Sequence, residues 1–129
     1  MSVEDTRRLV QRYIAEVWNA GSVDVLDEIY DPNFTEFGGI PGVKESVTEF
    51  RTSFPDLHFE TDDVVAEDDK IVYRWTARGT HDGEYDGIAP TGNKMMVSGI
   101  TILHIANGRI VDDRFESNLH TLPDQLKRS

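Results

Sequence analysis

Three polar side chains near the C-terminal end of the chain have the types and spacing of a reactive group. Arg114, Glu116 and Asn118 stand at every second position of a segment that we expect to be a strand, so they should share one face. A carboxylate such as Glu116 can act as a general base, whereas the amide of Asn118 can only donate or accept hydrogen bonds. The alternative is that Glu116 only neutralises a buried Arg114 guanidinium.

Histidine is the other residue type here that transfers protons near neutral pH. His104 falls on the neighbouring predicted strand, where a carboxylate partner would favour its imidazolium form, and we expect it to work with Glu116. His81 opens a long loop, where it could gate a ligand or make a turn contact. The four histidines lack the close spacing of a metal-binding helix, so no metal site is predicted.

Length and charge restrict the class of protein. The 129 residues suffice for one domain, which we place at residues 1–129. A net charge of -11 disfavours binding to nucleic acid and to anionic membranes. There is no cysteine, the N-terminus is acidic, and no long apolar run follows. We therefore expect a cytoplasmic protein that binds neither nucleic acid nor membrane.

The hydrophobic period changes midway along the chain. Apolar residues recur at helical spacing in residues 3–20, in a short segment up to residue 30, and again in residues 43–54. A brief strand is expected at residues 34–37. Alternation then predicts four strands joined by tight turns and one exposed, mobile loop at 81–93, with the strands at residues 57–67, 70–80, 94–106 and 109–119. Helices followed by a meander predict an α+β fold.

Strand parity locates a possible pocket. In residues 70–80 the set containing Tyr73 and Trp75 should face the helices. In residues 94–106 both alternating sets are apolar, so parity alone does not choose a face. Aromatic residues could line a pocket or simply fill the core, and the candidates for contact with a ligand are Tyr13, Trp18, Phe34, Phe37 and Trp75.

A long run of the sequence resembles a known family. Residues 74–84 read RWTARGTHDGE and residues 87–92 read GIAPTG, similar to the RWT..GTH.GE..GI.PTG run of SnoaL-like polyketide and ester cyclases. The segments EVWNAG, FPDL, GITI and NGRI, which begin at residues 16, 54, 99 and 107, also resemble that family.

The resemblance implies the nuclear transport factor 2-like fold, a cone-shaped curved antiparallel sheet wrapped around a long N-terminal helix. It implies that the helix-facing side of the last two strands contains His104 and Asn118, together with Ile100, Ile102 and Arg114 as pocket residues. Relatives close a polyketide ring by intramolecular aldol condensation without metal or cofactor. Their last strand usually carries a W...D motif, and here Arg114 and Asn118 stand at those two positions.

Two functional hypotheses follow from the resemblance. The first is a cofactor-independent enzyme that acts on a small apolar carbonyl compound by aldol or isomerase chemistry, with His104, Glu116 and Asn118 as catalytic residues and His81 near the ligand. The second is a non-catalytic domain that binds a small apolar organic ligand and has lost the family carboxylate at Asn118.

We also predict a homodimer that forms through the sheet. The residues expected on its outer face are too apolar for a monomer, namely Val72, Thr76, Val97, Thr101 and Leu103.

Overall fold

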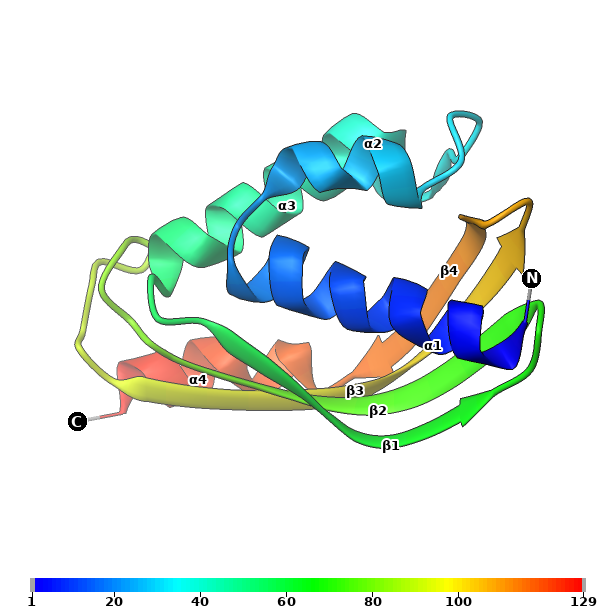
Figure 1. Cartoon of the computed structure of the whole chain (residues 1–129). Coiled ribbons are helices and arrows are strands. Elements are labelled where there is room, and N and C mark those ends of the chain that lie inside the picture. The colour runs from blue at the N-terminus through cyan, green and yellow to red at the C-terminus, as the bar shows by residue number, and fades with distance from the viewer. Residues whose placement is uncertain (1, 129) are drawn as a thin grey trace.

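Helices occupy the first half of the chain and strands most of the second (Figure 1). The computed structural model describes residues 2–128. The helical elements are α1 (Val3–Arg12), η1 (Tyr13–Asn19), η2 (Val23–Val25), α2 (Leu26–Ile29), η3 (Glu36–Gly38), α3 (Gly39–Ser53), η4 (Leu119–Thr121) and α4 (Leu122–Lys127). The strands are β1 (His58–Ala66), β2 (Lys70–Thr80), β3 (Lys94–Ala106) and β4 (Arg109–Ser117).

The predicted long first helix is confirmed, with a change of winding inside it. Ser2 and Asp5 form a reciprocal capping box at its start, in which the side chain of each accepts a hydrogen bond from the backbone N–H of the other. From Tyr13 to Asn19 the helix widens into π-helical turns, which in proteins often occur at functional sites. The buried side chains of this segment are Tyr13, Ile14 and Val17, so the widened turns supply the core.

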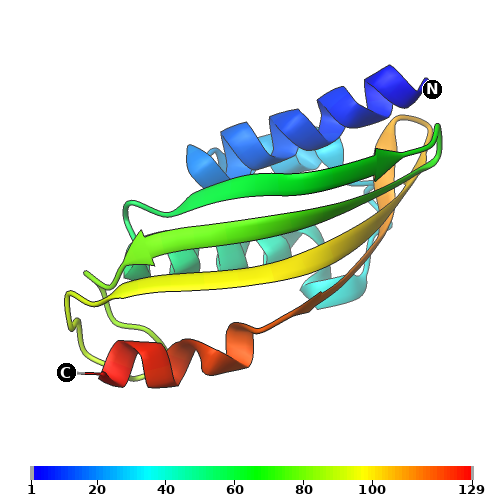
Figure 2. The ribbon, with the colours of Figure 1, turned by 90° about the horizontal axis from the view of Figure 1, so that it is seen from below.

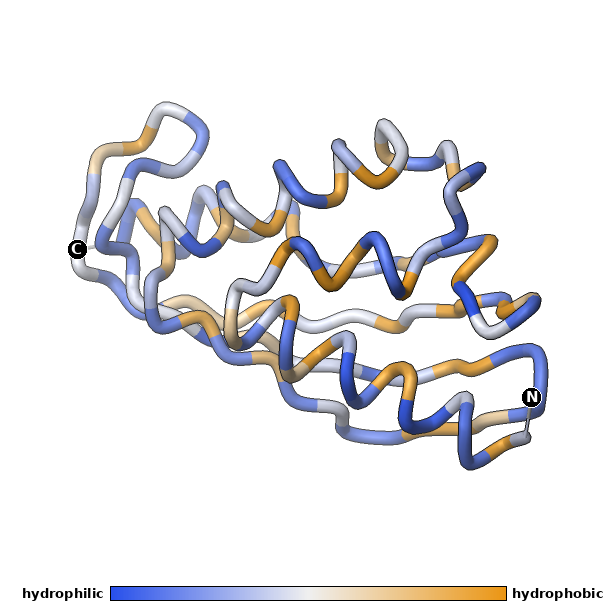
Figure 3. Tube along the Cα trace, turned by 45° about the horizontal axis from the view of Figure 1, so that its top comes forward, coloured by the Kyte–Doolittle hydropathy of each residue, from blue (hydrophilic) through white to orange (hydrophobic). Residues whose placement is uncertain are grey.

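The four strands form one antiparallel sheet in the order β1-β2-β3-β4. The helices cover one face of it, with α1 against the strands and α2 and α3 beyond, while Figure 2 shows the other face free of crossing helices. Along α1 and α3 the apolar residues recur about once per turn, which is the pattern that buries one side of each helix (Figure 3). The α+β fold with a curved sheet around the first helix is confirmed.

Parity on β2 agrees with the prediction, but parity on β3 does not. Tyr73 and Trp75 are buried on the helix-facing side. Trp75 pairs with Gly99, and an added Cβ on that glycine would lie 2.5 Å from the indole. Because directly opposite residues share a face, the odd-numbered residues of β3 point inward. The prediction that His104 faces the helices is therefore wrong.

The turn between β3 and β4 fixes the face of the last strand. Asn107 and Gly108 both adopt left-handed backbone angles, as a two-residue hairpin turn requires. A bulge next to His104 leaves one extra residue on β4, so Leu103 lies opposite Asp113 rather than Asp112. Asp113 consequently shares the inner face with Leu103.

Three local predictions need correction. Residues 34–37 form no strand, since Phe37 turns into η3 with a φ of 58° and α3 begins directly afterwards at Gly39. The loop 81–93 is not exposed where it begins, because His81 is fully buried. Helix α4, which packs beside β3, was not expected from the sequence. Among residues 2–128 the structure contains no helix with the length and apolarity needed to cross a membrane.

Candidate functional site

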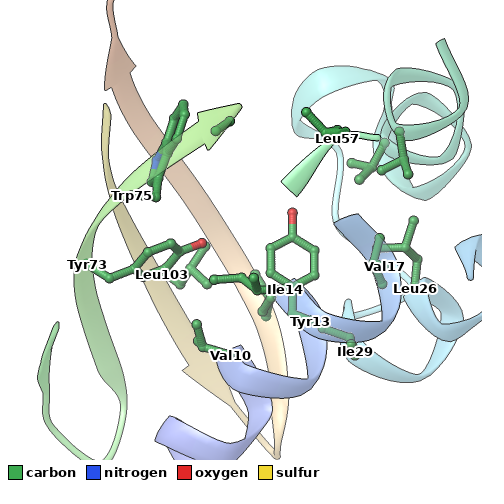
Figure 4. Close-up of a cluster of buried hydrophobic side chains, with 14 of the residues drawn as sticks. Val10, Tyr13, Ile14, Val17, Leu26, Ile29, Leu57, Tyr73, Trp75 and Leu103 are labelled. Carbon is green, nitrogen blue, oxygen red and sulfur yellow. The ribbon is translucent and has the colours of Figure 1, made fainter. Parts of the chain in front are cut away.

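A cavity of about 250 Å³ lies between the helices and the inner face of the sheet. Its wall is mainly aromatic and aliphatic. The residues that line it include Tyr13, Trp18, Phe59, Tyr73, Trp75 and Asp113. Figure 4 shows the hydroxyl groups of Tyr13 and Tyr73 pointing into the space between sheet and helices. A mostly apolar pocket with few polar groups is typical of a site for a small organic molecule.

Three neighbouring aromatic rings, tilted against one another, form one wall of the cavity. Phe59 lies between Trp18 and Trp75, with ring-centroid distances of 4.9 and 5.2 Å. Trp75 is held in place because its Nε1 donates a hydrogen bond of 2.9 Å to the hydroxyl of Thr101. A continuous aromatic surface of this kind favours a flat ligand.

Asp113 is the single carboxylate among the residues that line the cavity. It is 8% exposed, and Tyr30 Oη donates a hydrogen bond of 2.8 Å to its Oδ2. Burial raises the pKa of Asp113 to about 6, and the negative charges of Glu36 and Asp112 add to the rise while the bond from Tyr30 opposes it. The carboxylate is therefore ionised at neutral pH and close to the pKa that suits a general base.

The tyrosine hydroxyls form a chain that ends at this carboxylate. Tyr30 Oη lies 3.1 Å from Tyr13 Oη as well as 2.8 Å from Asp113. A phenol has one proton, so Tyr30 donates to the ionised carboxylate and accepts from Tyr13. Burial raises the pKa of both phenols, which keeps them protonated as donors.

A second carboxylate holds the strand that carries Asp113. Glu36 Oε2, on η3, accepts a hydrogen bond of 3.1 Å from the backbone N–H of Asp113. A hydrogen bond with Asp112 raises the pKa of Glu36, and the same bond lowers the pKa of Asp112. Glu36 thus connects η3 to β4 immediately behind the buried acid.

Two half-exposed phenylalanines flank the opening of the cavity. Phe37 follows Glu36 and is 48% exposed, and Phe115, the next inward residue after Asp113, is 45% exposed. Their ring centroids are 5.6 Å apart. Both rings line the cavity, as considered for Phe37 from the sequence, so a ligand that fills it would contact them.

His104, Arg114 and Glu116 do share one face, as predicted, but that face points away from the cavity. The register pairs Ile102 with Arg114 and Ile100 with Glu116, on the same side as His104. Glu116 is exposed, and Arg114 and His104 both approach Asp112, at 3.1 and 3.3 Å. Neither the couple of Glu116 with His104 nor the pair of Glu116 with Arg114 forms among residues 2–128.

Asn118 lies beyond the end of β4 and has a structural contact. Its Oδ1 accepts a hydrogen bond of 2.9 Å from the backbone N–H of Ser98, and it precedes η4. Ile100 and Ile102, predicted as pocket residues, are exposed on the outer face instead. The prediction that Asn118 and these isoleucines face the helices is wrong, for the reason given by the register of β3.

Of the predicted ligand contacts, Tyr13, Trp18 and Trp75 lie on the cavity wall. Phe34 is buried behind the wall, with its ring 4.7 Å from that of Tyr30. His81 does not line the cavity, and its Nδ1 accepts a hydrogen bond of 3.2 Å from the backbone N–H of Thr91. The turn contact considered for His81 is therefore the one that the structure shows.

Asp113, Tyr30 and Tyr73 were not predicted from the sequence as site residues. Tyr73 could have been found, because it alternates with Trp75 on the strand whose parity was correctly predicted. Asp113 could not, because its face depends on the bulge in the β3–β4 pair. No group of three or more histidine, aspartate or glutamate residues in the part of the chain from 2 to 128 could hold a metal ion.

The chain belongs to the SnoaL-like polyketide cyclase family, whose pattern matches residues 8–126. Solved structures agree with this assignment. TsrD from Streptomyces laurentii is 26% identical, with a TM-score of 0.87 and 98% of each chain covered. A proposed polyketide cyclase from Bacillus cereus is 28% identical, with a TM-score of 0.79, covering 95% of this chain and 80% of its own.

The same fold also occurs in a protein described by a different activity. AclR from Streptomyces galilaeus, a proposed hydroxylase, is 23% identical, with a TM-score of 0.83, covering 97% of this chain and 86% of its own. No protein with a curated description matches this sequence. The relatives share the nuclear transport factor 2-like fold, which confirms the fold predicted from the sequence.

Proposed function

We propose that this protein is an enzyme that removes a proton from carbon next to the carbonyl group of a small apolar compound, without a cofactor. Asp113 is the general base. The observation that carries this proposal is the position of Asp113, a lone carboxylate on an apolar cavity with its pKa raised to about 6.

The chemistry requires only proton transfers and one rearrangement of bonding electrons. Asp113 takes a proton from the carbon next to the carbonyl, and the electrons of the broken C–H bond move onto the carbonyl oxygen to give an enolate. In an aldol closure the enolate carbon attacks a second carbonyl carbon, and the resulting alkoxide takes the proton back from Asp113. In an isomerisation of an unsaturated ketone, a more distant carbon of the dienolate takes that proton instead. An apolar wall that limits access of water protects the enolate from premature protonation.

Membership of a cyclase family supports this reaction class but does not distinguish it from the other reactions that the same fold can carry. AclR shares the fold under the description of a proposed hydroxylase, so the reaction must be argued from the site. Asn118 occupies the family's carboxylate position and cannot serve as a base. Asp113 supplies from inside the cavity what Asn118 lacks.

One observation favours the alternative of a non-catalytic binding domain. Asn118 stands where the family usually has an acid, and its side chain accepts a hydrogen bond from the backbone of Ser98. A domain of this kind would use the same aromatic wall to hold a ligand and would transfer no proton. The two functions differ in one measurable property, which is exchange of C–H protons in a bound ketone.

The test uses β-tetralone, a flat bicyclic ketone with acidic C–H groups beside its carbonyl. In deuterium oxide, proton NMR follows the loss of those signals with wild-type protein, Asp113→Asn and the outward-facing control Glu116→Gln. We expect Asp113→Asn to slow the catalysed exchange by about 10² to 10⁴ and Glu116→Gln to leave it unchanged. Binding of the ketone without any catalysed exchange in the wild type would support the binding domain instead.

A further inference from the structure

The protons of the aromatic donors around the cavity can be followed to their acceptors. The proton of Tyr30 goes to Asp113, and the proton of Tyr13 goes to Tyr30. The indole proton of Trp75 goes to Thr101. All three of these donors are therefore occupied before a ligand arrives.

Tyr73 differs from the other two tyrosines. Its side chain is 4% exposed and lines the cavity, and among residues 2–128 its hydroxyl has one hydrogen-bond partner, the hydroxyl of Thr101. Thr101, directly opposite on β3, accepts from Trp75 and has its own proton to donate to the oxygen of Tyr73. Burial raises the pKa of Tyr73 and the hydrogen bond with Thr101 opposes the rise, which is the effect of a bond donated to the phenol oxygen. The proton of Tyr73 is left as the one phenolic donor that points into the cavity without a partner (Figure 4).

The register places this free donor within reach of a ligand that also touches Asp113. Tyr73 lies opposite Thr101, and Asp113 lies opposite Leu103, the next inward residue along β3. One strand therefore separates them on the same face, with an offset of two residues along it, which corresponds to about 12 Å between their backbones. Burial raises the pKa of Tyr73 and the charge of Asp113 adds to the rise, so the two side chains are close enough to interact. The carbonyl oxygen of a ketone and its neighbouring carbon could contact both groups.

The charges of the cavity restrict the ligand further. No lysine or arginine is among the residues that line it, and its one charged group is the carboxylate of Asp113. A ligand carboxylate or phosphate would meet that negative charge with no cation to compensate its loss of water. An uncharged ligand meets no such cost.

We propose that Tyr73 is the residue that recognises the substrate oxygen, and that the cavity consequently selects flat, uncharged compounds with a carbonyl group over anions and over hydrocarbons of the same shape. This inference rests on the proposed function for the placement of the carbonyl beside Asp113. Buried polar groups without partners discriminate strongly, since a ligand without a matching acceptor leaves the Tyr73 proton unpaired.

The experiment compares three ligands by titration calorimetry. They are β-tetralone, its methylene analogue with CH₂ in place of the carbonyl oxygen, and the corresponding bicyclic carboxylate. The proteins are the wild type, Tyr73→Phe, which keeps the ring, and the control Tyr85→Phe, whose hydroxyl does not line the cavity. The carbonyl stretching band of bound β-tetralone is recorded alongside, because a donated hydrogen bond lowers its frequency.

The wild type should bind the ketone roughly threefold to tenfold more tightly than the methylene analogue, and the carboxylate most weakly. Tyr73→Phe should lose the preference for the ketone and shift the carbonyl band to its position in hydrocarbon solvent, while Tyr85→Phe keeps both properties. A Tyr73→Phe protein that retains the preference overturns the proposal. Equal binding of ketone and analogue by the wild type, or binding of neither, also overturns it.

Two further results keep the test decisive. If Tyr73→Phe does not fold, the wild-type band alone decides, since a band at the hydrocarbon position shows that no donor reaches the carbonyl. Binding and deuterium exchange are separate measurements, so the two proposals fail in different ways. If the ketone binds with a hydrogen bond but no catalysed exchange occurs, the result contradicts Asp113 as a base and still supports Tyr73. If exchange occurs at the same rate in Tyr73→Phe, the result contradicts the role of Tyr73 alone.

Discussion

Asp113 experiences two opposing effects in the apolar cavity. Burial disfavours its charge, and the hydrogen bond from Tyr30 favours it. Burial is the larger effect, so the folded protein holds the proton of Asp113 more tightly than the unfolded chain does. A base that is both ionised near neutral pH and only moderately stable in that form is suited to taking a proton from carbon.

The free energy of unfolding should depend on pH because of this raised pKa. The pKa of Asp113 rises from 3.8 to about 6 on folding, so between those values the folded state binds more protons than the unfolded state. The contribution of Asp113 to the free energy of unfolding is therefore largest below about pH 4, falls as the pH rises to about 6, and in total changes by about 3 kcal/mol. Urea unfolding of wild type and Asp113→Asn across this range measures it, since the asparagine does not titrate. A constant difference between the two proteins would contradict the prediction.

Glu116 should behave as an ordinary surface residue. Its side chain is exposed on the outer face, and no hydrogen bond or ion pair of residues 2–128 uses its carboxylate. We expect Glu116→Gln to change the free energy of unfolding by less than about 0.5 kcal/mol, as surface substitutions usually do. Thermal unfolding checks this, and a loss of several kcal/mol would indicate a buried pair with Arg114 after all.

At the scale of elements, two strand pairings put the site together. The pair of Trp75 with Gly99 turns the odd-numbered residues of β3 inward, and the bulge beside His104 then turns Asp113 inward on β4. Gly99 is needed because the indole of Trp75 and the backbone oxygen of Glu116 both lie over its Cα. The absence of a side chain at Gly99 on β3 thus leaves room for the indole of Trp75 on β2.

Gly99→Ala tests this close approach. The added Cβ would lie 2.5 Å from Trp75 Cζ2 and 2.6 Å from the backbone oxygen of Glu116, and the backbone cannot yield as a flexible side chain would. We expect a loss of about 1 to 3 kcal/mol in the free energy of unfolding, with a displaced Trp75. Chemical denaturation with tryptophan fluorescence measures both effects. Ser98→Ala, one residue away on the outer face, should change neither, and equal behaviour of the two variants would contradict the argument.

Much of this arrangement could be predicted from the sequence, because periodicity is a local property. The long first helix, the four strands and the inward face of β2 all follow from the spacing of apolar residues. The grouping of His104 with Arg114 and Glu116 on one face was also correct. The prediction that this face points toward the helices was wrong, because β3 is apolar on both sides and a single bulge determines which residues of β4 point inward. Those are tertiary properties that no residue of β4 reveals by itself.

At the scale of the molecule, the sheet has one covered face and one open one. The outer face carries exposed apolar side chains at Met96 (53%), Ile100 (42%) and Ile102 (37%), together with the outward Val72 and Thr76. The other residues predicted for this face point inward, namely Val97, Thr101 and Leu103. We therefore still predict a homodimer through the sheet, with Met96, Ile100 and Ile102 as its expected contact residues on β3.

The oligomeric state can be tested on that corrected face. We expect sedimentation to give twice the mass of one chain, and Ile100→Asp to give a single chain, because a charge at the centre of an apolar contact loses its water without a partner. The folded cavity should survive this substitution, since Ile100 points away from it. Wild type that sediments as one chain at micromolar concentration would contradict the dimer.

The pH dependence of deuterium exchange in β-tetralone tests most directly whether Asp113 is the base. The wild-type exchange rate at saturating ketone should rise about tenfold per pH unit at low pH and level off above a midpoint near the Asp113 pKa of about 6. Asp113→Asn should slow the exchange by about 10² to 10⁴ and abolish the midpoint, and Glu116→Gln should keep both the rate and the midpoint. A wild-type rate without any inflection in this range, or one that survives in Asp113→Asn, would contradict the account.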